Sequence, residues 1–191
     1  MKTSLLSYLK IILAFLATIG ISICFAGLFG IIHDQITYSI CNEYYTKFKF
    51  HQFGLTELSG EAILPNPRMA VAKVGFLATW WVGKYIGIVF GLTGLIFNNY
   101  KGMMKAILKA LGWTFCITIV TAAIGFLYGN YFTNVNTVNW WFPDNLIHKK
   151  EFVTVGTIHN FSYLGGALGL IFGIVYLIVK NNSERKTTME Q

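Results

Sequence analysis

Hydrophobic and polar positions along the chain separate into four long apolar runs joined by more polar segments. A bilayer core about 30 Å thick requires roughly 20 apolar residues in a helix, and each run is about that long. Because none of the runs alternates as a barrel strand would, the pattern predicts an all-α membrane protein, a bundle of four transmembrane helices. The predicted spans are residues 9–32, 74–97, 104–128 and 156–179.

The segments between the spans differ in length and character. We predict one membrane domain over residues 1–191, with outer segments at 33–73 and 129–155 and a tail at 180–191. The first outer segment is rich in large aromatic residues, which predicts an ordered structure, either a small hairpin or a cap lying on the bundle. In the second, Asn139-Trp140-Trp141-Phe142-Pro143 has the aromatic content of a membrane-interface belt.

The composition changes this picture little but excludes other classes of protein. Of the 191 residues, 54% are hydrophobic and 12% are charged, whereas a soluble domain carries about 25% charged residues. A disordered chain and a nucleic-acid-binding domain are therefore excluded. We therefore interpret the formal net charge of +7 as a consequence of membrane topology.

The distribution of charge predicts the orientation, since cytoplasmic segments carry an excess of Lys and Arg. The segments on one side hold eight cations and two acids, a net charge of +6, and those on the other side hold six of each. Both termini are therefore predicted to be cytoplasmic, and segment 33–73 becomes an extracytoplasmic cap. The eight cations are Lys2, Lys10, Lys101, Lys105, Lys109, Lys180, Arg185 and Lys186, and the two acids are Glu184 and Glu190.

Glycines recur every four residues in two of the spans. Without a hydrophobic drive between helices in lipid, small residues at this spacing let two backbones approach closely. We interpret both rows as helix-packing surfaces. They are Gly83, Gly87 and Gly91 in the second span, and Gly165, Gly169 and Gly173 in the fourth.

Polar residues gather where the first span leaves the bilayer and the fourth enters it on the same side. His33 and Asp34 lie at the first point and His159 at the second, while Glu43 lies on the segment that must cover this mouth. Buried His and carboxylate groups at a membrane are costly unless they are paired. We therefore name His33, Asp34, Glu43 and His159 as candidate metal ligands or proton-transfer groups. Gln35, Thr37, Asn160 and Tyr163 are the candidates for orienting them.

Three interpretations of this cluster stay open on the sequence. Two His with a carboxylate suit a transition metal such as Zn, Fe, Mn or Cu. His33 and His159 could instead ligate a haem between helices. The third interpretation is a structural hydrogen-bond network that fixes the outer segment to the bundle. The His and acidic residues do not show the spacing within one span that makes metal sites specific.

Lys84 is an intramembrane charge in the second span, where an ionised group is expensive. It is either functional or extends past Trp80 toward the interface, with a cation–π contact to that ring.

The residues around this cluster resemble a signature of uncharacterised bacterial four-span integral membrane proteins. That signature is similar to His-Asp-Gln-x-Thr, then Glu-Tyr-[Phe/Tyr]-Thr, with Ala-Thr-Trp-Trp-Val-Gly in the second span. The matching elements here are His33-Asp34-Gln35-Ile36-Thr37, Glu43-Tyr44-Tyr45-Thr46 and Ala78-Thr79-Trp80-Trp81-Val82-Gly83. The resemblance implies a multi-pass protein of the bacterial inner (plasma) membrane and implies no activity.

Two hypotheses for function follow. The first is a polar, metal-binding site at the extracytoplasmic mouth of the bundle, which leaves open whether the protein is an enzyme. The alternative is a non-catalytic accessory or structural subunit that docks a protein partner, or a second copy of the chain, through outer aromatics such as Trp140 and Phe142. In either case the lipid bilayer is a partner and nucleic acid is not.

Overall fold

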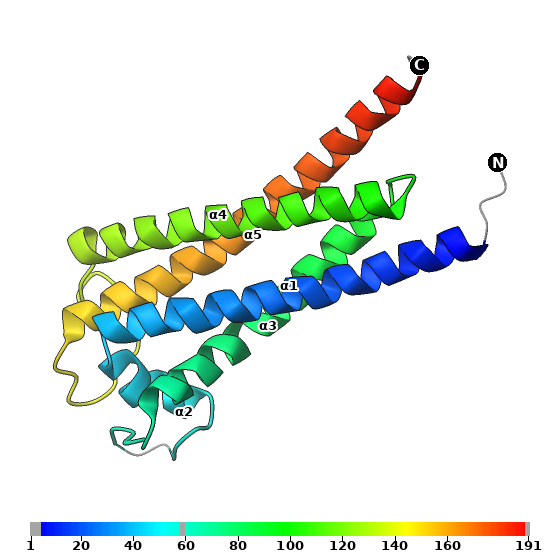
Figure 1. Ribbon diagram of the computed structural model, residues 1–191. Coiled ribbons are helices and arrows are strands. Elements are labelled where there is room, and N and C mark those ends of the chain that lie inside the picture. The colour runs from blue at the N-terminus through cyan, green and yellow to red at the C-terminus, as the bar shows by residue number, and fades with distance from the viewer. Residues whose placement is uncertain (1–4, 58–59, 190–191) are drawn as a thin grey trace.

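The computed structural model describes residues 5–57 and 60–189, which form an all-α bundle without strands (Figure 1). Four helices within these residues are long and apolar enough to cross a membrane, so the predicted four-span bundle is confirmed. They are α1 (Leu5–Ile40), α3 (Pro67–Gly94), α4 (Tyr100–Phe132) and α5 (Lys149–Met189). A π-helical turn, η1 (Tyr45–Lys49), and the short α2 (Phe50–Gln52) lie between α1 and α3. Lys2 and Glu190, counted above for orientation, lie outside the described residues.

The starts of two helices follow from their local sequence. Asn66 caps α3, its side chain accepting a hydrogen bond from the Met69 N–H at 3.3 Å, and Pro67 occupies the first turn. Asn99 caps α4 by accepting from the Gly102 N–H at 2.8 Å. α1 and α5 extend well beyond their apolar runs, so the polar residues at the predicted mouth stand on continuous helix.

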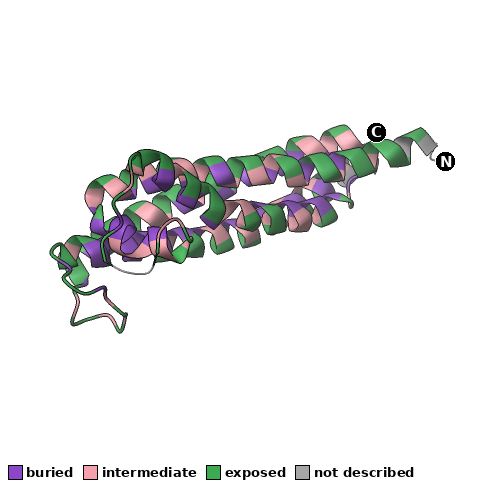
Figure 2. Ribbon diagram, turned by 90° about the horizontal axis from the view of Figure 1, so that it is seen from below, coloured by how far each residue is buried: buried purple, intermediate pink, exposed green. Residues whose placement is uncertain are grey.

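The bundle consists of two closely packed helix pairs, α1 with α3 and α4 with α5, and contact between the pairs is sparse. Within each pair, glycine residues allow the two helix backbones to approach closely. A Cβ at Gly83 would collide with the backbone carbonyl of Ser22, and a Cβ at Gly169 would lie 2.7 Å from the Cα of Thr114. The buried residues form inward-facing stripes (Figure 2), whereas Leu, Ile and Phe side chains cover the outside, as contact with lipid requires.

The segment after α1 folds as a helical cap at the end of the bundle opposite the two termini (Figure 1). An ordered cap was predicted, but the hairpin alternative is wrong. Helical turns satisfy backbone groups within the segment, for example Thr46 N–H to the Asn42 carbonyl at 2.9 Å, whereas an isolated hairpin is marginal. The helical turns also direct the side chains of Tyr44, Tyr45 and Phe50 into a core that includes Val71 and Val155.

In the loop before α5, two aromatic residues that were predicted to lie on the surface pack against α5. Trp140 lies against Gly156, so that a Cβ there would meet its ring at 2.6 Å. Phe142 packs on Phe152, with ring centroids 6.0 Å apart. Trp141 is 73% exposed. Trp140 and Phe142 are therefore partly buried by contacts within the chain, and their docking role stays a prediction.

Replacing Gly83 with Leu should destabilise the protein by about 1–3 kcal/mol, because the new side chain forces α1 and α3 apart. Gly20→Leu is the matched control, since a Cβ at Gly20 meets nothing within 4 Å. Thermal unfolding in detergent measures both variants. Equal melting temperatures for the two would contradict the assigned α1–α3 packing.

Candidate functional site

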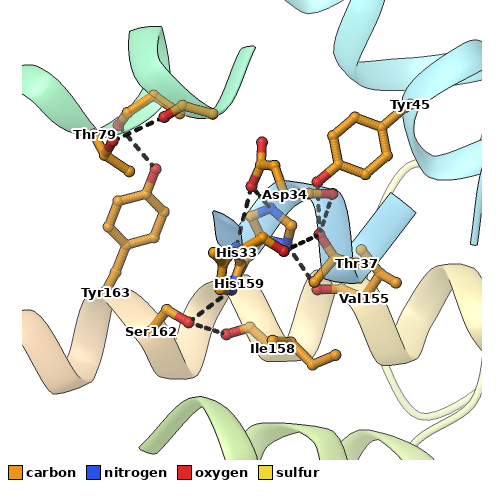
Figure 3. A network of polar contacts seen from close by, with 12 residues as sticks. His33, Asp34, Thr37, Tyr45, Thr79, Val155, Ile158, His159, Ser162 and Tyr163 are labelled. Atoms are coloured by element: carbon orange, nitrogen blue, oxygen red, sulfur yellow. Dashed lines mark hydrogen bonds and ion pairs between the residues drawn. The ribbon is translucent and has the colours of Figure 1, made fainter. Parts of the chain in front are cut away.

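His33, Asp34 and His159 converge at the capped end of the bundle and could together hold a metal ion (Figure 3). The first two stand on α1 and the third on α5. Asp34 Oδ1 lies 3.1 Å from His33 Nδ1 and 3.3 Å from His159 Nε2. One ligand atom from each residue lies within 4.8 Å of the others, and both Asp34 and His159 are buried.

The hydrogen bonds of the two imidazole rings show that neither ring nitrogen facing Asp34 carries a proton when its ring is neutral. His159 Nδ1 lies 2.9 Å from the Val155 carbonyl, an acceptor only, so Nδ1 carries the proton and a neutral ring turns a lone pair at Nε2 toward Asp34. The Ser162 hydroxyl donates to the Ile158 carbonyl and so accepts from His33 Nε2, at 3.0 Å. In neutral His33 the lone pair is then at Nδ1, which also faces Asp34. Three acceptors converge, an arrangement that needs a cation, either a metal ion or a proton.

A second polar contact joins the cap to α1 beside this cluster. The Thr37 hydroxyl donates to the His33 carbonyl at 3.1 Å. The same hydroxyl accepts a hydrogen bond from the Tyr45 hydroxyl at 2.6 Å. Burial, assisted by the negative charge of Asp34, raises the pKa of Tyr45 well above its ordinary value, so its hydroxyl remains a donor. Thr37 is thus tied to the cluster through the backbone of α1.

Tyr44 covers His159 from the cap, its ring stacked on the imidazole with centroids 5.1 Å apart. Behind it, the buried ammonium of Lys49 lies 5.5–5.9 Å from the ring centroids of Tyr44, Phe48 and Phe53. Burial lowers the pKa of Lys49, and the charge of Asp34 acts in the opposite direction. The cap therefore closes the cluster with aromatic rings and one desolvated amine.

The structure does not bring Glu43 into the metal-capable group. Its buried carboxylate pairs with Lys47 and accepts from the backbone N–H groups of Ile147 and His148, at 3.1 and 2.6 Å. These N–H groups precede the first turn of α5, where a carboxylate is favourably placed. Glu43 thus fastens the cap to α5.

Three of the residues predicted to orient the ligands make no hydrogen bond with the His33, Asp34 and His159 side chains. Gln35 bonds to Arg68, its amide donating to the Arg68 carbonyl at 2.8 Å, and Asn160 is exposed. Tyr163 turns toward α3, where its hydroxyl lies 3.4 Å from the Ala78 carbonyl. Ser162, which contacts His33 directly, was not predicted, although it lies one helical turn from His159 on the same face.

Lys84 is exposed on the outside of α3, and its ammonium lies 6.0 Å from the ring centroid of Tyr85. The aromatic partner is thus Tyr85, where the sequence suggested Trp80.

A haem between the two histidines does not fit this arrangement. The imidazoles of His33 and His159 contact each other edge to face, with centroids 4.7 Å apart, and both face one carboxylate oxygen. No macrocycle can lie between rings in direct contact.

A cavity of about 100 Å³ adjoins the cluster and is lined by all four long helices. Asp34 Oδ2 and Ser22 Oγ, two buried oxygens of residues that line it, have no hydrogen-bond partner within the described part of the chain. Buried polar atoms are usually paired, so Asp34 Oδ2 is an unusual feature of the cavity wall.

Comparison of the chain with protein-family models, with curated proteins and with solved structures yields no match. The site is therefore interpreted from its own geometry.

Glu43→Gln should lower stability by about 2 kcal/mol at pH 7, because the variant removes a charge-assisted anchor of the cap. Burial raises the Glu43 pKa, but the hydrogen bonds from Lys47 and the two N–H groups outweigh it and hold this pKa below its ordinary 4.5. The stabilisation is then complete above pH 4.5 and is lost as the pH falls through the lowered folded-state value.

Melting temperatures of wild type and Glu43→Gln, measured between pH 3 and 7, should therefore converge in acid. Glu57→Gln, on an exposed glutamate of the same segment, is the control and should leave the curve unchanged. A difference that stays constant with pH would show that Glu43 does not act as an ionised anchor.

Proposed function

We propose that this membrane protein binds a divalent transition metal through His33 Nδ1, Asp34 and His159 Nε2. The observation that carries the proposal is the convergence of two imidazole lone pairs and a carboxylate on one buried point. In a tetrahedral site with metal–ligand distances of about 2.1 Å, ligand atoms lie about 3.4 Å apart. The separations of Asp34 Oδ1 from the two nitrogens, 3.1 and 3.3 Å, are close to that value, and the two nitrogens lie within 4.8 Å of each other.

The ligand set favours particular metals and leaves part of the coordination shell open. Two histidines and one carboxylate suit Zn²⁺ or a non-haem Fe²⁺. Three protein ligands leave at least one position for water or another ligand, as in sites that carry out chemistry. The hydrogen bonds from His159 to Val155 and from His33 to Ser162 hold both rings in the required tautomer.

Protein purified without a polyhistidine tag should contain about one equivalent of Zn or Fe, as three good ligands predict, when measured by elemental analysis. His33→Ala, Asp34→Asn and His159→Ala should each lose it, because two ligands cannot hold the ion. His148→Ala, on an exposed histidine, is the matched control and should retain it.

A metal-free wild type that also fails to take up Zn²⁺ or Fe²⁺ after dialysis would overturn this proposal. The same three atoms would then share a proton and form a structural ion pair between α1 and α5. In that case His159→Ala would lower the melting temperature without any change in metal content.

We also propose that both termini are cytoplasmic and that the cap is extracytoplasmic, in a bacterial plasma membrane. The charge asymmetry supports the orientation, and both termini lie at one end of the bundle (Figure 1), so they share a side. The bacterial plasma membrane rests on the resemblance described above.

Orientation can be tested with cysteine variants in a background lacking Cys24, Cys41 and Cys116. Asn136→Cys, in the loop before α5, should react with a membrane-impermeant maleimide on intact spheroplasts, because that loop faces outward. Asn98→Cys, in the turn between α3 and α4, should react only after lysis. Both positions are exposed, so the opposite pattern of labelling would reverse the proposed orientation.

A further inference from the structure

A groove of about 620 Å³ lies between α1 and α4, toward the end of the bundle where the two termini lie (Figure 1). The two helices belong to different pairs and make few contacts with each other, so the groove is a gap that the chain itself leaves open. It shares no lining residue with the cavity beside the histidine cluster. Its volume is within the range of ligand-binding clefts, roughly 300–1,000 Å³.

The groove changes from basic to apolar with depth. Lys10 of α1 and Lys101 and Lys105 of α4 line it and are exposed. Ala17 and Leu108 line it further along the same two helices, ~10 Å from Lys10 and Lys101 at 1.5 Å per residue. Because both spans begin within two residues of Lys10 or Lys101, the basic part lies at the membrane surface and the apolar part lies within the hydrocarbon.

The three lysines form no ion pair with a carboxylate in the part of the chain that the structure describes. α4 carries no acidic residue in its first turn, where the helix dipole favours an anion and disfavours a cation. Glu184 of α5 approaches this turn beside Gly102, but it pairs with Lys180 at 3.4 Å. The groove thus concentrates positive charge that a bound anion would neutralise.

We propose that this groove binds a phospholipid with an anionic head group, its phosphate among Lys10, Lys101 and Lys105. Charge complementarity selects the head group, and basic pockets between transmembrane helices bind such lipids. The groove has to hold only the head group and the first part of an acyl chain, because Leu13 and Leu108 in its wall are exposed to the bilayer. This inference goes beyond the proposed metal site and does not depend on it.

Lys105→Gln tests the head-group site, and Lys109→Gln is its matched control. Lys109 lies one turn further along α4, is also exposed, and does not line the groove. Each variant therefore removes one charge from the same part of the same helix. Lys105→Gln should weaken the binding of an anionic lipid about fivefold, the effect of one lysine near an anionic head group, whereas Lys109→Gln should leave it unchanged.

The probe is dioleoyl phosphatidylglycerol, titrated into the delipidated full-length protein in non-ionic detergent together with an equal concentration of dioleoyl phosphatidylcholine. Native mass spectrometry separates the two complexes by mass and gives the occupancy of each lipid. One phosphatidylglycerol should bind the wild type in preference to phosphatidylcholine, because choline cancels the phosphate charge that attracts the lysines. Glycerol 3-phosphate at the same concentration should not displace it, since this soluble anion has no chain to contact the apolar part.

Equal binding of the two lipids would overturn the inference, and so would equal weakening by Lys105→Gln and Lys109→Gln. Either result would reduce the three lysines to a general surface charge without a site. Displacement by glycerol 3-phosphate would also overturn it, because the groove would then bind a soluble anion and not a lipid.

Discussion

A carboxylate buried inside a membrane helix must be matched by a cation or by donors, and Asp34 imposes that requirement on the capped end of this bundle. Both candidate ligands, His33 and His159, turn a ring nitrogen toward its Oδ1. Their other ring nitrogens are occupied by Ser162 and the Val155 carbonyl. Because these partners come from α5 while Asp34 comes from α1, the cluster joins helices that otherwise make few contacts with each other.

The sparse contact between the helix pairs has the same origin as their close internal packing. Glycine surfaces direct α1 toward α3 and α4 toward α5, because small residues let two helix backbones approach closely in lipid. Larger side chains such as Phe29 and Phe115, in edge-to-face contact at 5.8 Å, then meet across the pairs. Bulky rings across a wide interface fill space less completely than glycine contacts, which is why the cavity lies between the pairs and extends to the cluster.

Much of the fold could be predicted from the sequence, since apolar runs and glycine spacing are local signals. His33, Asp34 and His159 could be named because charged or titratable residues beside an apolar run are few. Glu43 could not be placed, because its role depends on the backbone N–H groups of a loop about a hundred positions away. Ser162 and Tyr45 were missed for a related reason: hydroxyl groups are common, and only the folded chain shows that Ser162 contacts His33 and that Tyr45 contacts Thr37.

The cap gives the two sides of the cluster different access. Glu43 holds the cap on α5, and the neighbouring residue, Tyr44, stacks on His159, so the anchor and the cover are adjacent in the chain. This cover packs rings and the desolvated amine of Lys49 above the cluster. Away from the cap, the cavity beside the cluster is lined in part by Phe25 and Tyr163, which are exposed on the outside of the bundle. The cluster is thus covered more fully at the capped end than along the sides of the helix pairs.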